Sequence, residues 1–429
     1  MIRSRVTFVD LHAVGPIMAI PTGQIPGRSK LRVTLREVTE ALVAQMNAPT
    51  MRPPEWDGFE WGIARAVVAI HGIAGILLRD LRWTEPAHWR EFLAVQVEET
   101  RRQHREIAAA LDEIDRLALD SSIPVMILKG CALHELAIYQ PGERPMADLD
   151  LLVRPRDLEE MVELLGRAGF VARGASGKHV EFDRLRNAER VKVDLHSRLV
   201  ERLAGRFVEM PGESIVEDGG GLRGYASRAA MMRHLLLHTA GNMGKRWVRA
   251  IHLYDIAQLS GRLESADWQE LSSRAWPERW SIYPPLLLAS RYFPGAIPPE
   301  IVAELAAACP SLLARSARRQ TLSDVSASNP SQLALPELAW CTSLGTLLRY
   351  LKMRLFPARI ELQGLRGLAQ TADFAGGQRW FTMSHPMRIA TWMFRRPIRP
   401  ATLHAIHRGL AYGATSSVDA DRGGTIAHP

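Results

Sequence analysis

The sequence has few cysteines, and they lie far apart. Three occur among the 429 residues, at Cys131, Cys309 and Cys341, and no two of them form a C-x-x-C pair. Their number and spacing argue against a disulfide framework and against a structural zinc site, and they fit a reducing compartment. We therefore expect a cytoplasmic location.

Long hydrophobic runs are also missing. The most apolar stretch, Ala66 to Leu78, has thirteen residues, whereas a membrane-spanning helix needs about 20. Residues 1–30 carry charges and prolines where a secretory signal would have an apolar segment. We therefore expect no stable membrane association, and we interpret residues 66–78 as part of a buried helix.

The excess of positive charge is small. There are 54 lysines and arginines against 46 aspartates and glutamates, which gives a formal net charge of +8 and a pI near 9.7. Such an excess fits a substrate that carries phosphate or an RNA partner, but many basic proteins of this size bind neither. Charge alone leaves the partner open.

Hydrophobic spacing divides the chain into two helical regions around a short mixed segment. Apolar residues with a helical period predict helices before residue 120 and again after Ser227, whereas short apolar runs between them are typical of strands. We predict an α+β fold with a small mixed β-sheet core. The predicted parts are an N-terminal irregular segment with helices at 1–104, the core at 105–215, a C-terminal helical domain at 226–415 and a disordered tail at 416–429.

Individual elements follow from the same patterns. Helices are predicted at Leu31–Met46, Trp61–Leu78, Pro86–Leu119, Arg246–Ser260 and Pro336–Arg354. Strands are predicted at Val125–Leu128, Asp148–Val153, Phe170–Ala172, His179–Phe182 and Val191–Leu195. Residues 184–190 are predicted to be a charged connection, and Gly219 to Gly221 a linker or loop.

Three aspartates are the candidate chemical centre. Asp148 and Asp150 are two residues apart on a predicted strand, so both carboxylates should project from one face. Asp194 lies on a later strand, and the three share a small volume if the two strands are neighbours. Close carboxylates repel one another unless a cation lies between them, and Mg²⁺ prefers such ligands. Two metal ions could activate an attacking hydroxyl and stabilise a leaving pyrophosphate, although a lone D-x-D pair is usually a solvated strand end.

Three further residues are candidate phosphate ligands. Lys129 and Gly130 follow a predicted strand and open a predicted helix, where exposed N–H groups attract anions and a glycine lets the backbone approach a phosphate. The same pattern fits an ordinary turn with an exposed lysine. Arg144, four residues before Asp148, either binds phosphate through two hydrogen bonds or pairs with the aspartates.

Taken together, these segments resemble one protein family. They are Ile127-Leu128-Lys129-Gly130, Tyr139 with Pro141-Gly142, Arg144-x-Met146-x-Asp148-x-Asp150-Leu151-Leu152-Val153, Gly169-Phe170 and Val193-Asp194-Leu195-His196. They resemble the uncharacterised bacterial nucleotidyltransferase family of the DNA polymerase β superfamily, whose members often sit beside peptide-modification or polysaccharide genes. The resemblance covers roughly residues 100–260 and implies a nucleotidyltransferase core flanked by helices.

The resemblance also implies residue roles. Asp148 and Asp150 match the metal-binding D-x-D pair, and Asp194 matches the third carboxylate, which orients or deprotonates the acceptor hydroxyl or binds the second metal. Lys129 and Gly130 stand where the wider superfamily has Gly-Ser on the triphosphate, which is a departure from its pattern.

The function that the resemblance implies is transfer of an NMP from an NTP to an acceptor hydroxyl, with Mg²⁺ or Mn²⁺ and release of pyrophosphate. From the resemblance we expect the acceptor to be a small molecule, a peptide or RNA, and the pathway to be peptide natural-product or polysaccharide biosynthesis. One alternative is a toxin-like nucleotidyltransferase that acts on tRNA or protein. Another is a non-catalytic nucleotide-binding scaffold in a biosynthetic complex, favoured by the Lys129-Gly130 departure.

A second polar group follows the predicted core. His234 and His238 are four residues apart on one face of a predicted helix, which is compatible with a metal but fits better with histidines that line a cleft. Asp255 lies on the next helix, and the resemblance implies that these helices form a wall of the nucleotide pocket. Between them, Arg249 could contact phosphate, and Trp247 is expected to pack in the core.

Overall fold

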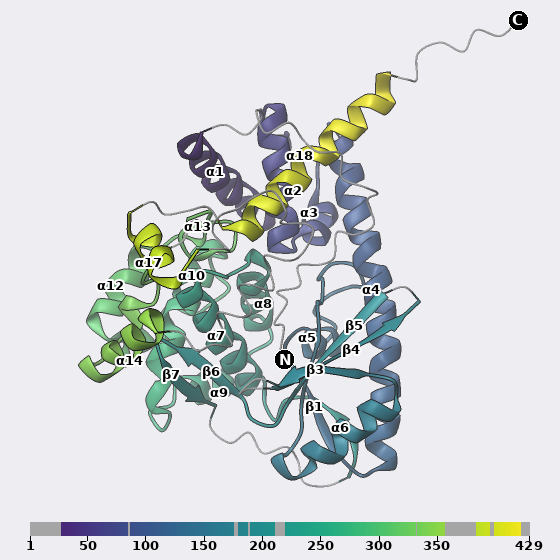
Figure 1. Cartoon of the computed structure of the whole chain (residues 1–429), viewed down its shortest axis with the longest axis vertical. Coiled ribbons are helices and arrows are strands. Elements are labelled where there is room, and N and C mark those ends of the chain that lie inside the picture. The colour runs from purple at the N-terminus through teal and green to yellow at the C-terminus, as the bar shows by residue number, and fades with distance from the viewer. Residues whose placement is uncertain are drawn as a thin grey trace, which may run out of the picture.

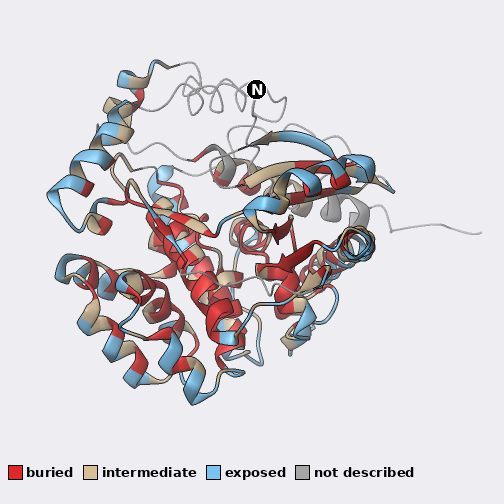
Figure 2. Ribbon diagram, turned by 90° about the horizontal axis from the view of Figure 1, so that it is seen from below, coloured by how far each residue is buried: buried red, intermediate tan, exposed pale blue. Residues whose placement is uncertain are grey.

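The computed structural model describes residues 27–84, 86–175, 179–187, 189–210, 219–331, 333–356, 383–394 and 399–421. A six-stranded mixed sheet lies between two sets of helices (Figure 1). Buried residues gather where the helices and the sheet meet, and exposed residues cover the outer surfaces (Figure 2). The predicted α+β fold, with a small mixed sheet flanked by helices, is confirmed.

Four helices precede the sheet: α1 (Arg28–Asn47), α2 (Gly58–His71), α3 (Ala74–Asp80) and α4 (Ala87–Asp120). The predicted single helix Trp61–Leu78 is wrong, because the chain turns between α2 and α3. Gly72 ends α2 in the left-handed conformation, with φ of +65°, and a side chain there would press against Pro145. The run from Ala66 to Leu78 is helical on both sides of this turn and largely buried.

The bend between α2 and α3 divides this apolar stretch into two helices, each of which is shorter than a membrane span. In the described part of the chain, no single helix combines the length and apolar character that crossing a membrane requires. The pair α2 and α3 meets that criterion only when both helices are taken together, and they are bent by 116°.

The sheet has the strand order β3-β4-β5-β2-β1-β8. Strand β2 pairs in parallel with β5 and antiparallel with β1, β8 pairs in parallel with β1, and β3, β4 and β5 are antiparallel neighbours. The strands are β1 (Pro124–Ile127), β2 (Leu149–Leu152), β3 (Val171–Ala175), β4 (His179–Arg186), β5 (Glu189–His196) and β8 (Gly221–Arg223). Between them lie α5 (Lys129–Glu135), the 3₁₀ turn η2 (Pro155–Asp157) and α6 (Leu158–Arg167).

One prediction in this region is wrong, and another is wrong only at its last residue. The supposed charged connection at 184–190 is mostly strand, because β4 continues to Arg186 and β5 begins at Glu189. The Arg184 guanidinium pairs with Glu113 of α4 at 2.7 Å, so its charge is compensated within the sheet–helix contact. Of the three glycines expected in a linker or loop, Gly219 and Gly220 lie outside the strands, whereas Gly221 begins β8.

One face of the sheet is packed and the other carries polar side chains. Helix α4 runs along the sheet and contacts β1, β5 and β8 (Figure 1). Leu149 and Leu151 of β2 are fully buried, as are Val193 and Leu195 of β5. Since strand side chains alternate between faces, the residues between these leucines and valines project from the opposite face.

A two-stranded hairpin and a helical region follow the sheet. The hairpin consists of β6 (Val200–Leu203) and β7 (Arg206–Glu209). The helices are α7 (Arg228–Lys245), α8 (Ala250–Ser260), α9 (Ser265–Leu271), η3 (Pro277–Ile282), α10 (Tyr283–Tyr292), α11 (Pro299–Ala308), α12 (Ser311–Arg319), α13 (Leu322–Val325), η4 (Leu338–Trp340), α14 (Leu344–Leu355), α17 (His385–Phe394) and α18 (Pro400–Asp421). The helices predicted at Arg246–Ser260 and Pro336–Arg354 therefore begin later than expected, at Ala250 and Leu344.

The last helix returns to the first ones. Helix α18 packs against α2, so chain segments from the two ends of the described region are neighbours (Figure 1). Gly62 and Gly409 make this contact close, because a side chain at Gly409 would collide with the backbone of Gly62. Part of the predicted tail, up to Asp421, is helical, and residues 422–429 lie outside the described residues.

Candidate active site

The predicted carboxylates lie on neighbouring strands. Asp150 of β2 and Asp194 of β5 are direct partners in the parallel ladder, so both project from the same face. Asp148 lies immediately before β2, two residues from Asp150. The side chain of Asp150 is 7% exposed and that of Asp194 is 21% exposed. The strand pairing that the sequence argument required is therefore present.

Lys129 lies over this group. Its ammonium is 2.7 Å from Oδ1 of Asp150, and the His196 imidazole, through Nε2, is 3.2 Å from the same oxygen. Lys129 has φ of +48°, in a region where residues other than glycine are uncommon. The turn from β1 into α5 thus holds Lys129 in an unfavourable backbone conformation that carries its side chain to the carboxylates.

The carboxylates differ in their pKa values. Burial, and next the charge of Asp150, raise the pKa of Asp148. Burial would also raise the pKa of Asp150, but Lys129 and His196 outweigh it and hold that pKa well below its usual range. Burial, with the charges of Asp148 and Asp150, raises the pKa of Asp194 to about 7. Burial and mutual repulsion therefore oppose ionisation of Asp148 and Asp194, whereas Lys129 and His196 keep Asp150 ionised.

Two histidines extend the group along β4 and β5. His179 and His196 are register partners, as are Glu181 and Asp194. Nε2 of His179 is 3.2 Å from Oε1 of Glu181 and 3.6 Å from Oδ2 of Asp194. Imidazoles therefore adjoin the carboxylates on the face opposite α4.

Arg144 binds a different aspartate. Its Nε and Nη2 donate to the two oxygens of Asp255, both at 2.8 Å, and the Tyr139 hydroxyl donates to the same carboxylate at 2.7 Å. Arg144 is 7% exposed and Asp255 is 2% exposed. The ion pair links the segment before β2 to α8. Arg144 therefore positions the segment that carries Asp148 and Asp150, and it does not pair with these two aspartates.

Gly130 makes room for this arginine. A side chain at Gly130 would collide with the Arg144 guanidinium and press against Met146. In this structure Gly130 is needed because Arg144 lies against it. The sequence pattern instead predicted a glycine that lets the backbone approach a phosphate.

Helix α7 faces the lysine and the carboxylates. The Lys129 N–H donates to the Tyr225 hydroxyl at 3.2 Å, which lies 2.6 Å from Nδ1 of His234. One turn later, Nδ1 of His238 lies 2.9 Å from Oε1 of Glu201, on β6. In the described residues, His234 and His238 have separate partners and belong to no cluster of ligand atoms that could hold a metal.

Arg249 is a cation close to this group. It precedes α8, and its Nε donates to Nε2 of His252 at 3.4 Å. No carboxylate of the described residues forms an ion pair with it, but it lies near enough to Asp148 to lower the pKa of that carboxyl. Burial, and next the charge of Arg144, lower the pKa of Arg249 itself. An anion bound beside Arg249 would raise the pKa of Arg249 and so oppose the effects of burial and of Arg144.

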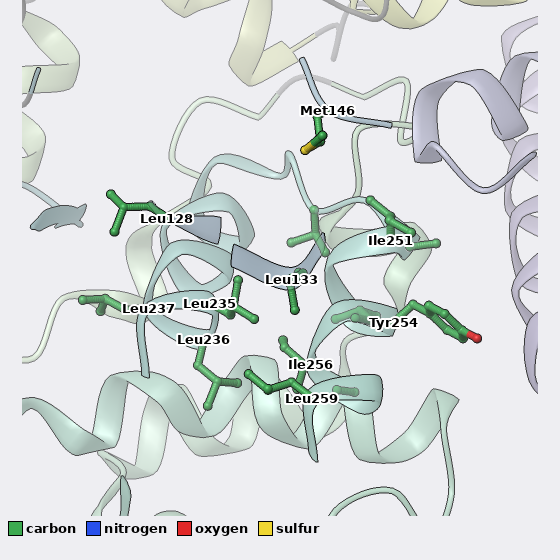
Figure 3. Close-up of a cluster of buried hydrophobic side chains, with 14 of the residues drawn as sticks. Leu128, Leu133, Met146, Leu235, Leu236, Leu237, Ile251, Tyr254, Ile256 and Leu259 are labelled. Atoms are coloured by element: carbon green, nitrogen blue, oxygen red, sulfur yellow. The ribbon is translucent and has the colours of Figure 1, made fainter. Parts of the chain in front are cut away.

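The polar groups rest on a hydrophobic cluster. Figure 3 shows Leu133 of α5 beside α7 and α8, with Leu235, Leu236, Ile256 and Leu259 gathered nearby. These five side chains are at most 5% exposed. The packing keeps α5, which carries Lys129, in a fixed position against α7 and α8.

Trp247 follows α7 and lies partly buried beside the same core. The guanidinium of Arg399 lies over its ring, 5.4 Å from the centroid. This contact supports the expected packing role of Trp247.

Sequence reasoning missed several members of the site. His179 and Glu181 were assigned to a strand without a role, although their alternation already placed them on one face. Tyr225 and Glu201 had no signal in the sequence, since their partners are distant: the hydroxyl of Tyr225 contacts a residue 96 positions away. The contact between Arg144 and Asp255 spans 111 positions.

Comparison with known proteins adds one finding. The family model described as "Uncharacterised nucleotidyltransferase" matches residues 57–294, which is more than half of the chain. Searches of curated proteins and of solved structures gave no match. The matched residues include all three carboxylates together with Lys129, Arg144 and Arg249. The chain therefore belongs to the family of uncharacterised nucleotidyltransferases.

Proposed function

We propose that this protein transfers an NMP from an NTP to the hydroxyl of an acceptor and releases pyrophosphate. The observation that carries this proposal is the pairing of Asp150 and Asp194 on adjacent parallel strands, with Asp148 two residues before Asp150 and near enough for its charge to raise the pKa of Asp194. Lys129 forms an ion pair with Asp150, and Arg249, which has no ion pair with a carboxylate of the described residues, lies near Asp148. Family membership supports an NTP substrate.

The carboxylates suit a divalent cation such as Mg²⁺ or Mn²⁺. Burial first, and then the charges of the neighbouring aspartates, raise the pKa values of Asp148 and Asp194, and a bound cation would oppose both effects. Their oxygens are the ligands that Mg²⁺ prefers. A bound cation would neutralise charge on the triphosphate while the acceptor oxygen forms a bond to the α-phosphorus and the bond to pyrophosphate breaks.

Residues of the chain would orient the acceptor hydroxyl and bind the phosphates. Asp194 would act on the acceptor hydroxyl in one of two ways. It would bind the second cation, or, with no cation on Asp194 itself, it would accept the proton of the hydroxyl, since a pKa of about 7 suits a base near neutral pH. Arg249 would bind the outer phosphates, and Lys129 would move from Asp150 to a phosphate oxygen when a cation takes its place. Positioning and charge would supply most of the rate.

Binding of NTP tests the first part of this proposal. Each of the four NTPs, as an analogue that cannot be cleaved at the α-phosphorus, is titrated calorimetrically with and without Mg²⁺. We expect binding of at least one analogue only with Mg²⁺. Failure of all four to bind would contradict the proposal, and binding without turnover of the natural NTP would favour the scaffold alternative.

Replacement of Arg249 by glutamine is expected to weaken NTP binding by about ten- to a hundredfold. A hydrogen bond to a charged group contributes about 1.5–3 kcal/mol, and 1.4 kcal/mol corresponds to a factor of ten. Stability should change little, because Arg249 has no ion pair with a described carboxylate to lose. The control is Arg156→Gln, whose side chain is 67% exposed. Equal NTP affinity in both variants would remove Arg249 from the site.

Binding of Mg²⁺ should depend on pH. Asp194, with a pKa of about 7, must lose its proton to bind a cation. Affinity for Mg²⁺ should therefore fall by about tenfold per pH unit below pH 7 and become constant above it, as expected when one proton is displaced. Calorimetry in buffers of different ionisation enthalpy measures the proton released. Constant affinity below pH 7 would contradict this role of Asp194.

A further inference from the structure

A nitrogen-containing cluster lies beside the three aspartates. His179 of β4 and Asp194 and His196 of β5 each place one potential ligand atom within 4.8 Å of the others. Two imidazoles and one carboxylate differ chemically from the all-oxygen group formed by Asp148, Asp150 and Asp194. The two groups share Asp194.

We propose that His179, Asp194 and His196 bind a divalent transition metal of the Zn²⁺ or Co²⁺ type, next to the carboxylate site. The inference extends the proposed function but does not depend on transfer activity. Imidazole nitrogens favour such metals, whereas Mg²⁺ prefers oxygen ligands.

The distances are close to those that a metal requires. Zinc–nitrogen and zinc–oxygen bonds are about 2.0–2.2 Å, so two ligands of one metal lie roughly 3 to 4 Å apart. Nε2 of His179 is already 3.6 Å from Oδ2 of Asp194, and the two imidazole centroids are 5.0 Å apart. Small side-chain rotations would therefore complete the set.

The scaffold is suited to hold these ligands. His179 and His196 face each other in an antiparallel ladder of two eight-residue strands. Val193 and Leu195 fix β5 from the opposite face, where both are fully buried. Glu181 and Asp150 each contact one of the imidazoles, at 3.2 Å, and could turn toward the metal or orient the rings.

The side chains remain accessible to an ion. Those of His179, Asp194 and His196 are 17%, 21% and 11% exposed. A metal would use a lone pair of each imidazole, and the ring proton would then reside on the other nitrogen. Partial exposure leaves room for water or a substrate group to complete the coordination.

Titration with Co²⁺ tests the site. Metal-free full-length protein is titrated while visible ligand-field absorption is followed, and X-ray absorption counts the imidazoles on the bound metal. We expect one Co²⁺ bound by two imidazoles, not displaced by excess Mg²⁺. Binding without imidazoles, or ready displacement by Mg²⁺, would overturn the proposal.

Variants separate this site from the nucleotide site. His179→Gln and His196→Gln should each weaken Co²⁺ binding by more than about a hundredfold, since even outer-shell partners of metal ligands contribute 10–100-fold. His104→Gln, a control in α4, should bind Co²⁺ normally. Asp148→Asn should keep Co²⁺ binding while losing Mg²⁺-dependent NTP binding. If both histidine variants stay folded and bind Co²⁺ like the wild type, the proposal is wrong, whatever the NTP results.

Discussion

Replacement of Asp148 by asparagine is expected to slow nucleotide transfer by about a thousandfold or more and to leave the fold intact. A metal ion contributes several kcal/mol to stabilising the charge of the transition state, and 1.36 kcal/mol corresponds to a factor of ten. Burial and the charge of Asp150 raise the pKa of Asp148, so loss of its charge removes a repulsion. The thermal unfolding midpoint should therefore stay the same or rise.

Asp148 is a better test than Asp150. Asp150→Asn should abolish transfer as well, but it would leave Lys129 without its partner at 2.7 Å and would disturb the contact with His196. A loss of activity would then combine lost metal binding with a local rearrangement. Transfer is measured as α-labelled nucleotide incorporated in cell extract, with Asp112→Asn as the control, because Asp112 is exposed on α4. Full activity of Asp148→Asn would contradict the site assignment.

Replacement of Asp255 by alanine is expected to lower the free energy of unfolding by about 3–5 kcal/mol, the usual effect of breaking a buried ion pair from one side. Arg144 would remain buried with both of its 2.8 Å hydrogen bonds lost, and the Tyr139 hydroxyl would lose its acceptor. Chemical denaturation, with the change in midpoint as the readout, measures the effect.

The control for Asp255 is an ion pair on the surface. Glu209→Gln breaks the pair with Arg198, in which the side chains are 64% and 49% exposed. Solvent screens such pairs, so this variant should unfold like the wild type. If Asp255→Ala also unfolded like the wild type, Arg144 and Asp255 would not hold the segment before β2 in place.

The local pattern of the sheet was readable from the sequence, but its long-range contacts were not. Alternating side chains identified the strands that carry Asp150 and Asp194, because period two is a local property. Their parallel pairing joins segments about forty residues apart, and alternation is the same whichever strand lies beside them. The resemblance to the nucleotidyltransferase family supplied that step.

Charges and a glycine account for the misread elements. Residues 184–190 look like a loop because they are charged, but Arg184 pairs with Glu113 in the folded protein. The apolar period continues through Gly72, so it cannot reveal that α2 and α3 are bent by 116°. Likewise, the sequence around Arg144 offers two nearby aspartates, whereas the partner in the structure is Asp255, 111 positions away.

The measurement that tests the central claim most directly compares each NTP labelled at the α-phosphate with the same NTP labelled at the γ-phosphate. The protein, Mg²⁺ and cell extract are incubated with NTP labelled at the α-phosphate or at the γ-phosphate, and the wild type is compared with Asp148→Asn. Transfer of the α-label to tRNA or to a protein would favour the toxin-like alternative, in which the same reaction uses a macromolecular acceptor. We predict that the wild type transfers the α-label to an acceptor, does not transfer the γ-label, and loses the transfer in Asp148→Asn. Transfer of the γ-label, or of no label from any of the four NTPs, would contradict a nucleotidyltransferase.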